Sequence, residues 1–293
     1  MSMEQYKLPL GKYIEIFFDW LVSSASGFFD AISVSLEWLI VASTDVLLWL
    51  HPLAFIAVLA GLAYWVHRAW PLVVFVIVSL LLIWNLGYWE ETMQTLSLVI
   101  YATLLCILVG LPIGIYAAHH PLVFKFIRPV LDLMQTVPPF VYLIPTLTLF
   151  GLGVVPGLIS TIIFAIAAPV RLTYLGISEV PKELVEAGQS FGMTQNQLLW
   201  RIELPAAASS IAAGVTQCIM LSLSMVVIAA LVGADGLGKP VVRALNTVDI
   251  ASGFEAGLAI VLLAILLDRL FLELQLQQQL QKELSVLTIL QST

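Results

Sequence analysis

The chain has 293 residues, of which 60% are hydrophobic and 11% are charged, and its formal net charge is −7. Soluble domains carry about 25% charged residues, so this composition excludes a water-soluble fold and indicates an all-α polytopic membrane protein. The negative charge and the lack of a basic cluster disfavour nucleic-acid binding. Cys106 and Cys218 both lie inside apolar runs, which favours packing roles over a disulfide or a metal pair.

Residues 1–50 form an N-terminal region in which acids interrupt an apolar sequence. From residue 13 to residue 50 these acids fall within a sector of about 120° on a helical wheel. The pattern predicts an amphipathic helix, broken near Ser26-Gly27, that lies in the membrane interface or packs on the bundle, at the external face. A membrane span is less favoured because carboxylates inside a bilayer are costly. The absence of a small-residue cleavage site argues against a cleavable signal peptide. The acids are Glu15, Asp19, Asp30, Glu37 and Asp45.

Residues 51–90 contain two short apolar runs, Leu53–Val66 and Leu72–Leu86, which we interpret as accessory spans extended by flanking Trp and Tyr residues. Thr92–Ala118 is a longer span, and the GxxxG spacing of Gly110 and Gly114 within it permits close helix approach. A short polar turn is predicted at His119–Arg128. We predict no metal site at its two adjacent histidines, because they point to different sides of a helix and have no acid or cysteine cluster nearby.

Val130–Phe150 is predicted as the next span, and its prolines are expected to bend it. Together with the later span Ala206–Val232 it supplies polar and bent positions suited to a translocation path. For each such residue, a role in helix packing is an equally good interpretation. The candidates for the path are Gln135, Thr136, Pro138, Pro139, Tyr142, Gln217, Ser222 and Ser224.

Val154–Ile177 is predicted to cross back, with Arg171 reaching the membrane interface near its end. The glycine-rich loop Gly233–Gly238 lacks a following Walker Lys-Ser/Thr and a preceding strand, so we reject nucleotide binding there. Phe254–Leu272 is the last predicted span. Residues 273–293 are expected to form a cytoplasmic helical tail.

A polar loop at residues 179–205 separates two of these spans, and its sequence predicts two short helices. Pro181 suits the first helical position, and good helix formers follow it. Gly192 suits a left-handed helix stop. Thr194 then starts a second helix with Gln197 as its capping-box partner, and Pro205 is expected to end that helix.

The spacing of residues in this loop resembles the EAA loop of ABC-importer permeases. Glu186-Ala187-Gly188 is followed by Gly192 and then by Ile202-x-Leu204-Pro205, and the departure is Gly188 where alanine is usual. The resemblance implies a cytoplasmic coupling helix that docks in a groove of an ATPase subunit. The face around Ala187, Gly188 and Phe191 would enter this groove, with Glu186 capping or pairing locally.

The distribution of Lys and Arg residues predicts the topology of the chain. Eight of them fall on the side of the 179–205 loop and four on the other side, so the positive-inside rule places the loop in the cytoplasm. Seven spans then give an external N-terminus and a cytoplasmic C-terminus.

Further segments resemble the permeases of the glycine betaine/proline betaine (ProU-type) osmoprotectant importers. These segments are Leu133–Pro138, Phe140–Pro145, Ser224–Ala229 and Gly253–Ile260. The resemblance covers about residues 90–272, which gives a type-I importer domain of five core helices at residues 91–272. It implies a homodimer of permeases in a prokaryotic inner membrane, a pair of ATPase subunits that hold ATP and Mg, and a separate external binding protein.

The chain itself has no nucleophile–base constellation and no Walker motif, so we expect no catalytic site in it. Two alternatives stay open at this point. The same machine could import choline, carnitine or another small zwitterion. A secondary transporter that needs no ATPase belongs to a different class, although we find no convincing internal repeat of broken helices.

Overall fold

The computed structural model describes residues 9–291, and every regular element in this part of the chain is helical, which confirms the all-α class. The elements in order are α1 (Leu10–Trp49), α2 (Pro52–His67), α3 (Trp70–Asn85), α4 (Trp89–His119), α5 (Pro121–Thr136), the 3-10 turn η2 (Pro139–Tyr142), α6 (Leu143–Phe150), α7 (Val154–Ala165), α8 (Ala167–Ser178), α9 (Lys182–Ser190), α10 (Gln195–Leu198), the π-helical turn η3 (Leu199–Glu203), α11 (Leu204–Ala230), α12 (Gly238–Thr247) and α13 (Ile250–Gln291).

Length and hydropathy identify the candidate membrane spans among the described residues. Five stretches qualify, and they are Gly11–Trp49, Trp89–His119, Val154–Ser178, Gln195–Ala230 and Ile250–Phe271. Helices α2 and α3 lie where the two short runs were predicted, but each has 16 residues, fewer than the about 20 that cross a bilayer without help. A sixth candidate is the bent pair formed by α5 with η2 and α6.

The span predicted at Val130–Phe150 falls within this bent pair, and the bend expected there is present, since the chain turns by 104° between α5 and the following η2–α6 helix. That the pair crosses the membrane as one span stays a prediction. Val137 and Pro138 have extended ψ angles of 131° and 129°. Each precedes a proline, and a residue before proline is pushed out of the helical region. The predicted polar turn at His119–Arg128 is wrong. Helix α5 already begins at Pro121, a residue suited to the first helical position.

Helices α4, α8 and α11 pack together as the centre of the bundle. Helix α4 approaches α8 closely at Gly114, where an added Cβ would lie 2.7 Å from the Cβ of Thr173 and 2.8 Å from the carbonyl oxygen of Val170. Gly110 of α4 likewise faces Pro169 of α8. The expectation of close helix approach at this GxxxG spacing is therefore confirmed.

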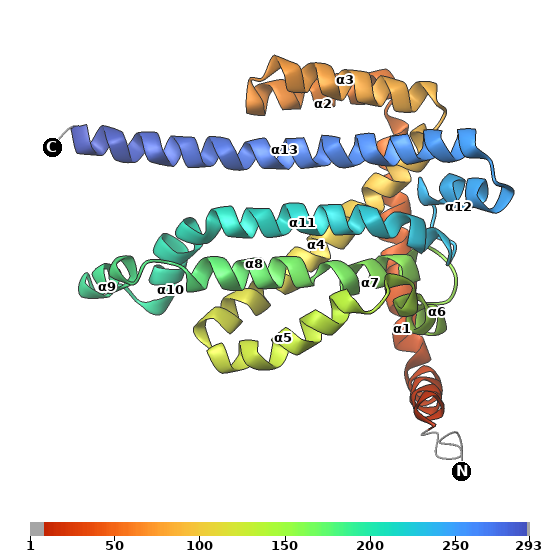
Figure 1. Cartoon of the computed structure of the whole chain (residues 1–293), viewed down its shortest axis with the longest axis horizontal. Helices are drawn as coiled ribbons and strands as arrows, with labels where there is room; N and C mark the ends of the chain where they lie inside the picture. Colours follow the sequence, from red (N-terminus) through yellow and green to blue (C-terminus); the bar gives the residue numbers. More distant parts are fainter. Residues whose placement is uncertain (1–8, 292–293) are drawn as a thin grey trace, which may run out of the picture.

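Helix α1 contains one non-helical residue, Ala25, next to the predicted break at Ser26-Gly27. Its five acids are all exposed. Figure 1 shows that α1 runs across the direction shared by α8, α11 and α13, whereas α2 and α3 run along it. This orientation suits a helix that lies on a membrane surface, although the length and hydropathy of α1 also meet the criteria for a span. Its surface position stays a prediction.

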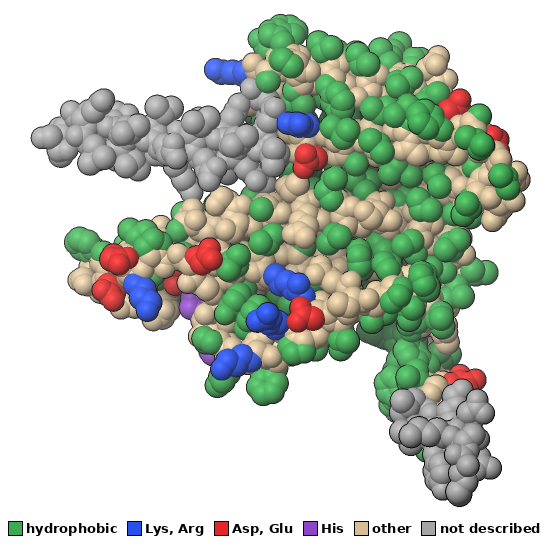
Figure 2. Space-filling view, in the orientation of Figure 1, with side chains coloured by type: hydrophobic (Ala, Val, Ile, Leu, Met, Phe, Trp, Pro, Cys, Tyr) green, Lys and Arg blue, Asp and Glu red, His purple; other side chains and the backbone are tan. Residues whose placement is uncertain are grey.

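The bundle has two distinct ends. Helices α9 and α10, the α2–α3 turn and the α4–α5 turn lie at one end, which we call the coupling end (Figure 1). Helices α6 and α12 lie at the opposite end, together with the loops at residues 151–153 and 231–237. Figure 2 shows hydrophobic side chains over much of the surface between them, and a mixed group of charged side chains over α9 and α10.

Candidate functional site

The first half of the 179–205 loop forms helix α9 (Lys182–Ser190). Pro181 precedes this helix with a ψ of 128°, so its prediction as the first helical residue is wrong by one position. Gly192 follows the helix with a φ of 76°, which confirms the predicted left-handed stop. An added Cβ at Gly192 would meet no atom within 4 Å, so this turn stands clear of the rest of the chain.

The second half begins with the predicted capping box. The Thr194 backbone N–H donates to Gln197 Oε1 at 2.9 Å, and the Gln197 backbone N–H donates to Thr194 Oγ1 at 3.4 Å. Pro205 does not end this second helix, which corrects the prediction. The chain passes through the π-turn η3, where the Leu204 N–H donates to the Leu199 carbonyl, and continues directly into α11. Pro205 occupies the first turn of α11, a position that tolerates its missing N–H.

The two halves of the loop are locked together at Gly188. This residue is buried, and an added Cβ would lie 2.6 Å from Ile202 Cδ1 and 2.7 Å from Leu198 Cδ2. The substitution of glycine for the usual alanine thus allows α9 to approach α10 and η3 more closely. The prediction that Gly188 belongs to the outward, ATPase-facing surface is wrong, because it faces inward.

The outward surface of the loop carries unburied apolar side chains. Phe191 is 86% exposed and Trp200 is 71% exposed, and Ala187, four residues before Phe191, is also exposed. No sequence motif pointed to Trp200. Glu186 is also exposed, and within the described residues its carboxylate makes no hydrogen bond or ion pair, so the expected local pairing is not seen. Apolar side chains at such exposure suit contact with a partner.

The candidates for the translocation path fall into two groups. Gln135, Thr136, Pro138, Pro139 and Tyr142 lie around the α5–η2 bend. The Tyr142 hydroxyl donates to the Leu133 carbonyl at 3.1 Å, and its ring lines a cavity of about 630 Å³ between α1 and α6.

The other group lies on α11. Gln217 and Ser224 are exposed there, but Ser222 is 0% exposed and donates to the Cys218 carbonyl at 2.8 Å. Ser222 is buried against neighbouring helices, so its assignment to an open path is wrong.

The interface position predicted for Arg171 stays a prediction, and the structure adds a partner for this side chain. Its Nη2 lies 2.6 Å from Asp132 Oδ1, so the side chain joins α8 to α5 by an ion pair. Both side chains are partly exposed. This pairing connects residues 39 positions apart, which a single sequence does not reveal.

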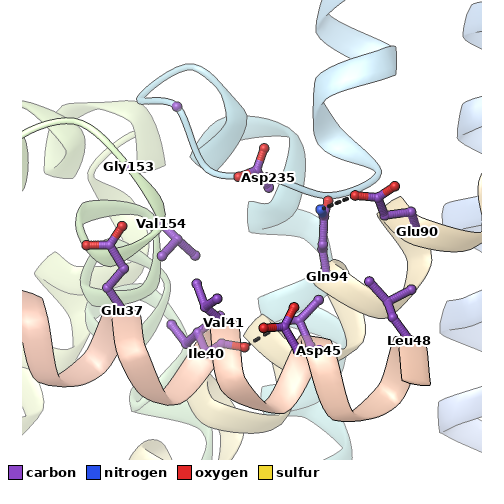
Figure 3. Close-up of a pocket in the computed structure, with 12 residues that line it drawn as sticks. Glu37, Ile40, Val41, Asp45, Leu48, Glu90, Gln94, Gly153, Val154 and Asp235 are labelled. Carbon is purple, nitrogen blue, oxygen red and sulfur yellow. Dashed lines mark hydrogen bonds between the residues drawn. The ribbon is translucent and has the colours of Figure 1, made fainter. Parts of the chain in front are cut away.

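A pocket of about 280 Å³ lies at the end of the bundle opposite the coupling end. Helix α1, the start of α4 and the loops that carry Gly153 and Asp235 line it. Figure 3 shows Glu37 and Asp45 rising from α1 on the side that faces the loop with Asp235, while Glu90 accepts a hydrogen bond from Gln94. Four carboxylates therefore surround this opening.

The glycine-rich loop at residues 233–238 follows helix α11 and is not preceded by a strand. Lys239 beyond it forms an ion pair with Asp235 one turn earlier. The only lysine next to this loop is thus engaged with a carboxylate, an arrangement unlike that of a phosphate-binding lysine.

The protein family described as "Binding-protein-dependent transport system inner membrane component" matches residues 110–275, more than half of the chain. The chain belongs to this family of permeases. The matched region runs from the middle of α4 through the coupling loop into α13, so it includes the helices that carry both groups of path candidates.

Characterised relatives of this permease match nearly its whole length. The glycine betaine/carnitine transport permease protein GbuB of Listeria monocytogenes is 46% identical over 90% of this chain and 94% of its own length. The glycine betaine transport system permease protein OpuAB of Bacillus subtilis is 43% identical over 90% of this chain and 93% of its own. The glycine betaine/proline betaine transport system permease protein ProW of Escherichia coli is 43% identical over 90% of this chain and 74% of its own length.

Among solved structures, the inward-facing MetNI methionine ABC transporter matches with a TM-score of 0.58 over 63% of this chain and 92% of that one. The sequence identity is 17%, so this likeness concerns the fold alone. It confirms the permease core of a type-I ABC importer that the sequence resemblance implied.

Proposed function

We propose that this chain is the membrane-spanning permease subunit of an ATP-driven importer for quaternary ammonium osmoprotectants of the glycine betaine and proline betaine type. The names of the relatives support this substrate class. The single observation that carries the ATP-driven mechanism is the coupling loop, a locked pair of short helices with Phe191 and Trp200 left unburied at one end of the bundle.

In this proposal the coupling loop works as a rigid lever. Gly188 holds α9 against Leu198 and Ile202, and the capping box fixes the start of α10. A partner ATPase that binds Phe191 therefore moves α9, α10 and η3 together. ATP, bound with Mg in the partner ATPase pair, would supply the free energy, and the two permease copies would change together from inward-facing to outward-facing. The remaining coupling residues, Ile202, Leu204 and Pro205, connect the loop to α11.

The coupling end faces the cytoplasm in this proposal, and the opposite end faces a separate substrate-binding protein outside the membrane. A second copy of the chain completes the translocation path, with residues 1–50 external and residues 273–293 cytoplasmic. The acidic pocket then lies on the delivery side. Asp235 is paired with Lys239, but the other three carboxylates have no basic partner among the described residues. They favour cationic groups over anionic ones, which suits a substrate with a quaternary ammonium.

The first experiment is purification of the tagged permease from native membranes, followed by an ATPase assay with and without glycine betaine and its binding protein. We expect an ATPase subunit to co-purify and its activity to rise when both additions are present. If the ATPase activity rises with choline or carnitine and not with glycine betaine, the proposed substrate is wrong and the ATP-driven mechanism still holds. Uphill transport by the permease alone in liposomes would overturn the proposal in favour of a secondary transporter.

A further inference from the structure

Glu203 is the one acidic or basic side chain that is buried among the residues whose exposure the structure describes, with 8% of its surface exposed. It is the last residue of the π-turn η3, which leads from the coupling loop into α11. A buried carboxylate is costly unless it is paired and hydrogen-bonded. Its position at the root of the coupling loop therefore depends on a partner.

His119, the last residue of α4, is that partner. Its Nε2 lies 2.9 Å from Glu203 Oε2, and its Nδ1 lies 2.9 Å from the carbonyl oxygen of Ile115. Both ring nitrogens therefore lie within hydrogen-bond distance of an oxygen atom, one on η3 and one on the backbone of α4. A carboxylate only accepts hydrogen bonds, so a protonated imidazole can donate to Glu203 and form an ion pair with it. His119 lies at the C-terminus of α4, where the helix dipole favours a positive charge.

The pair connects the coupling loop to a helix outside the loop. In the part of the chain that the structure describes, no other ion pair joins residues 182–203 to a membrane helix. Packing contacts connect α9 to this pair, because Gly188 of α9 packs on Ile202, and Ile202 is next to Glu203 in the π-turn. A displacement of α9 therefore reaches Glu203 through direct packing.

Helix α4 extends from this pair to the opposite end of the bundle. Its 31 residues span about 46 Å at 1.5 Å per residue. The far end of α4 carries Glu90 and Gln94, which line the acidic pocket. One helix thus touches both the root of the coupling loop and the opening on the opposite side.

We propose that the Glu203–His119 ion pair is the positioning contact through which the coupling loop moves α4. This inference rests on the proposed function, since it assigns the pair a part in the cycle of an ATP-driven importer. Neither residue touches substrate or nucleotide. They act through α4, and the ion pair keeps that helix attached to the loop while the loop follows the ATPase.

The test uses the assembled importer, with its ATPase and its binding protein, in proteoliposomes. The measurement is the number of glycine betaine molecules transported per ATP hydrolysed. We expect Glu203→Ala and His119→Ala each to lower this ratio about tenfold, within the range usual for coupling between sites. Co-purification of the ATPase and the basal rate of ATP hydrolysis should be retained, a separation that general misfolding would not produce.

Three further variants sharpen the test. The Glu203→Ala/His119→Ala double variant should be no worse than the poorer single variant, because both remove the same contact. His119→Gln keeps a donor for Glu203 and should recover part of the ratio. His120→Ala is the matched control and should leave the ratio unchanged, because among the described residues the hydrogen bond and the ring contact of the His120 side chain both go to Tyr116 of α4.

Unchanged transport per ATP in both alanine variants would overturn the inference, and so would additive losses in the double variant. Failure of the ATPase to assemble with both Glu203→Ala and the milder Glu203→Gln would assign the pair a purely structural role, which also overturns it. If the unmodified permease brings down no ATPase, the proposed function fails instead. The two failures are therefore distinguishable in the same preparation.

Discussion

Two glycine turns, one at each end of the bundle, share a left-handed backbone and differ in their surroundings. Gly192 in the coupling loop has a φ of 76°, and an added Cβ would meet nothing within 4 Å. Gly236 in the loop before α12 has a φ of 118°, and an added Cβ would lie 2.5 Å from Thr95 Oγ1. The first turn stands in open space, and the second is pressed against α4.

The loops around Gly236 are fastened to the bundle by contacts between distant residues. The Leu237 N–H donates to Thr95 Oγ1 at 2.9 Å, and the Gly153 N–H donates to the Val232 carbonyl at 2.9 Å. The turn at Gly192 has only local hydrogen bonds. The end around Gly236 is therefore closed by contacts within the chain, whereas the coupling end leaves contacts for a partner to make.

The largest loss of stability is expected for Gly236→Ala. This variant combines a strained φ with a clash against Thr95, and each effect costs about 1–3 kcal/mol. The measurement is the thermal unfolding midpoint of the purified permease. Gly192→Ala is the matched control, because it has the strained φ without the clash. Equal midpoints for the two variants would show that the far end is no more tightly fastened than the coupling end.

The largest loss of transport without loss of folding is expected for Gly192→Val. A β-branched residue is strongly disfavoured at positive φ, so the turn between α9 and α10 should open and the docking surface should lose its shape. Transport in proteoliposomes should fall at least about tenfold, a change of about 1.4 kcal/mol, while the amount of inserted permease stays normal. Gly192→Asn should keep most of the activity, since asparagine tolerates the left-handed region. Full transport by the valine variant would contradict a coupling role for this turn.

The coupling loop was largely predictable because its signals are local. The left-handed stop at Gly192 and the capping box of Thr194 with Gln197 each involve residues close in sequence, and both are present in the structure. The GxxxG spacing likewise indicated a close approach, although only the structure shows that α8 is the neighbour. Most of the helices and most features of the coupling loop could therefore be predicted from local backbone preferences and apolar runs.

Contacts across long sequence separations could not be predicted in this way. His119 and Glu203 are 84 positions apart, and nothing in a single sequence pairs them. The direction in which Gly188 faces depends on Leu198 and Ile202, and the burial of Ser222 depends on the helices packed around α11. Pro205 was misjudged for a related reason, because the π-turn before it carries the helix onward.

A smaller effect is expected for Thr194→Ala at the coupling end. Removing a capping hydroxyl costs about 1 kcal/mol of local helix stability, and the loop has few other contacts to compensate. Hydrogen exchange of the backbone amides in α10 should accelerate by about fivefold, which corresponds to that free energy. Thr194→Ser keeps the hydroxyl and should exchange at the original rate. Equal protection in the alanine variant would mean that the loop is held by more than its own local bonds.

The smallest effect is expected for Asp132→Asn, at the ion pair between α5 and α8. The side chains of Arg171 and Asp132 are 33% and 53% exposed, and exposed pairs contribute about 0–1 kcal/mol. Asparagine also retains an oxygen that accepts a hydrogen bond from the guanidinium. The unfolding midpoint should therefore move little, in contrast to a change at Glu203, whose side chain is buried.

Transport decides what the exposed pair does. If Asp132→Asn changes the apparent affinity for glycine betaine at an unchanged midpoint, Arg171 and Asp132 belong to the translocation path, where an exposed ion pair matches the two charges of a zwitterion. If both quantities stay unchanged, the path is lined elsewhere, and the pair only joins α5 to α8. In that case the exposed ion pair would contribute neither to stability nor to transport. The difference between the two ends would then depend only on the buried contacts.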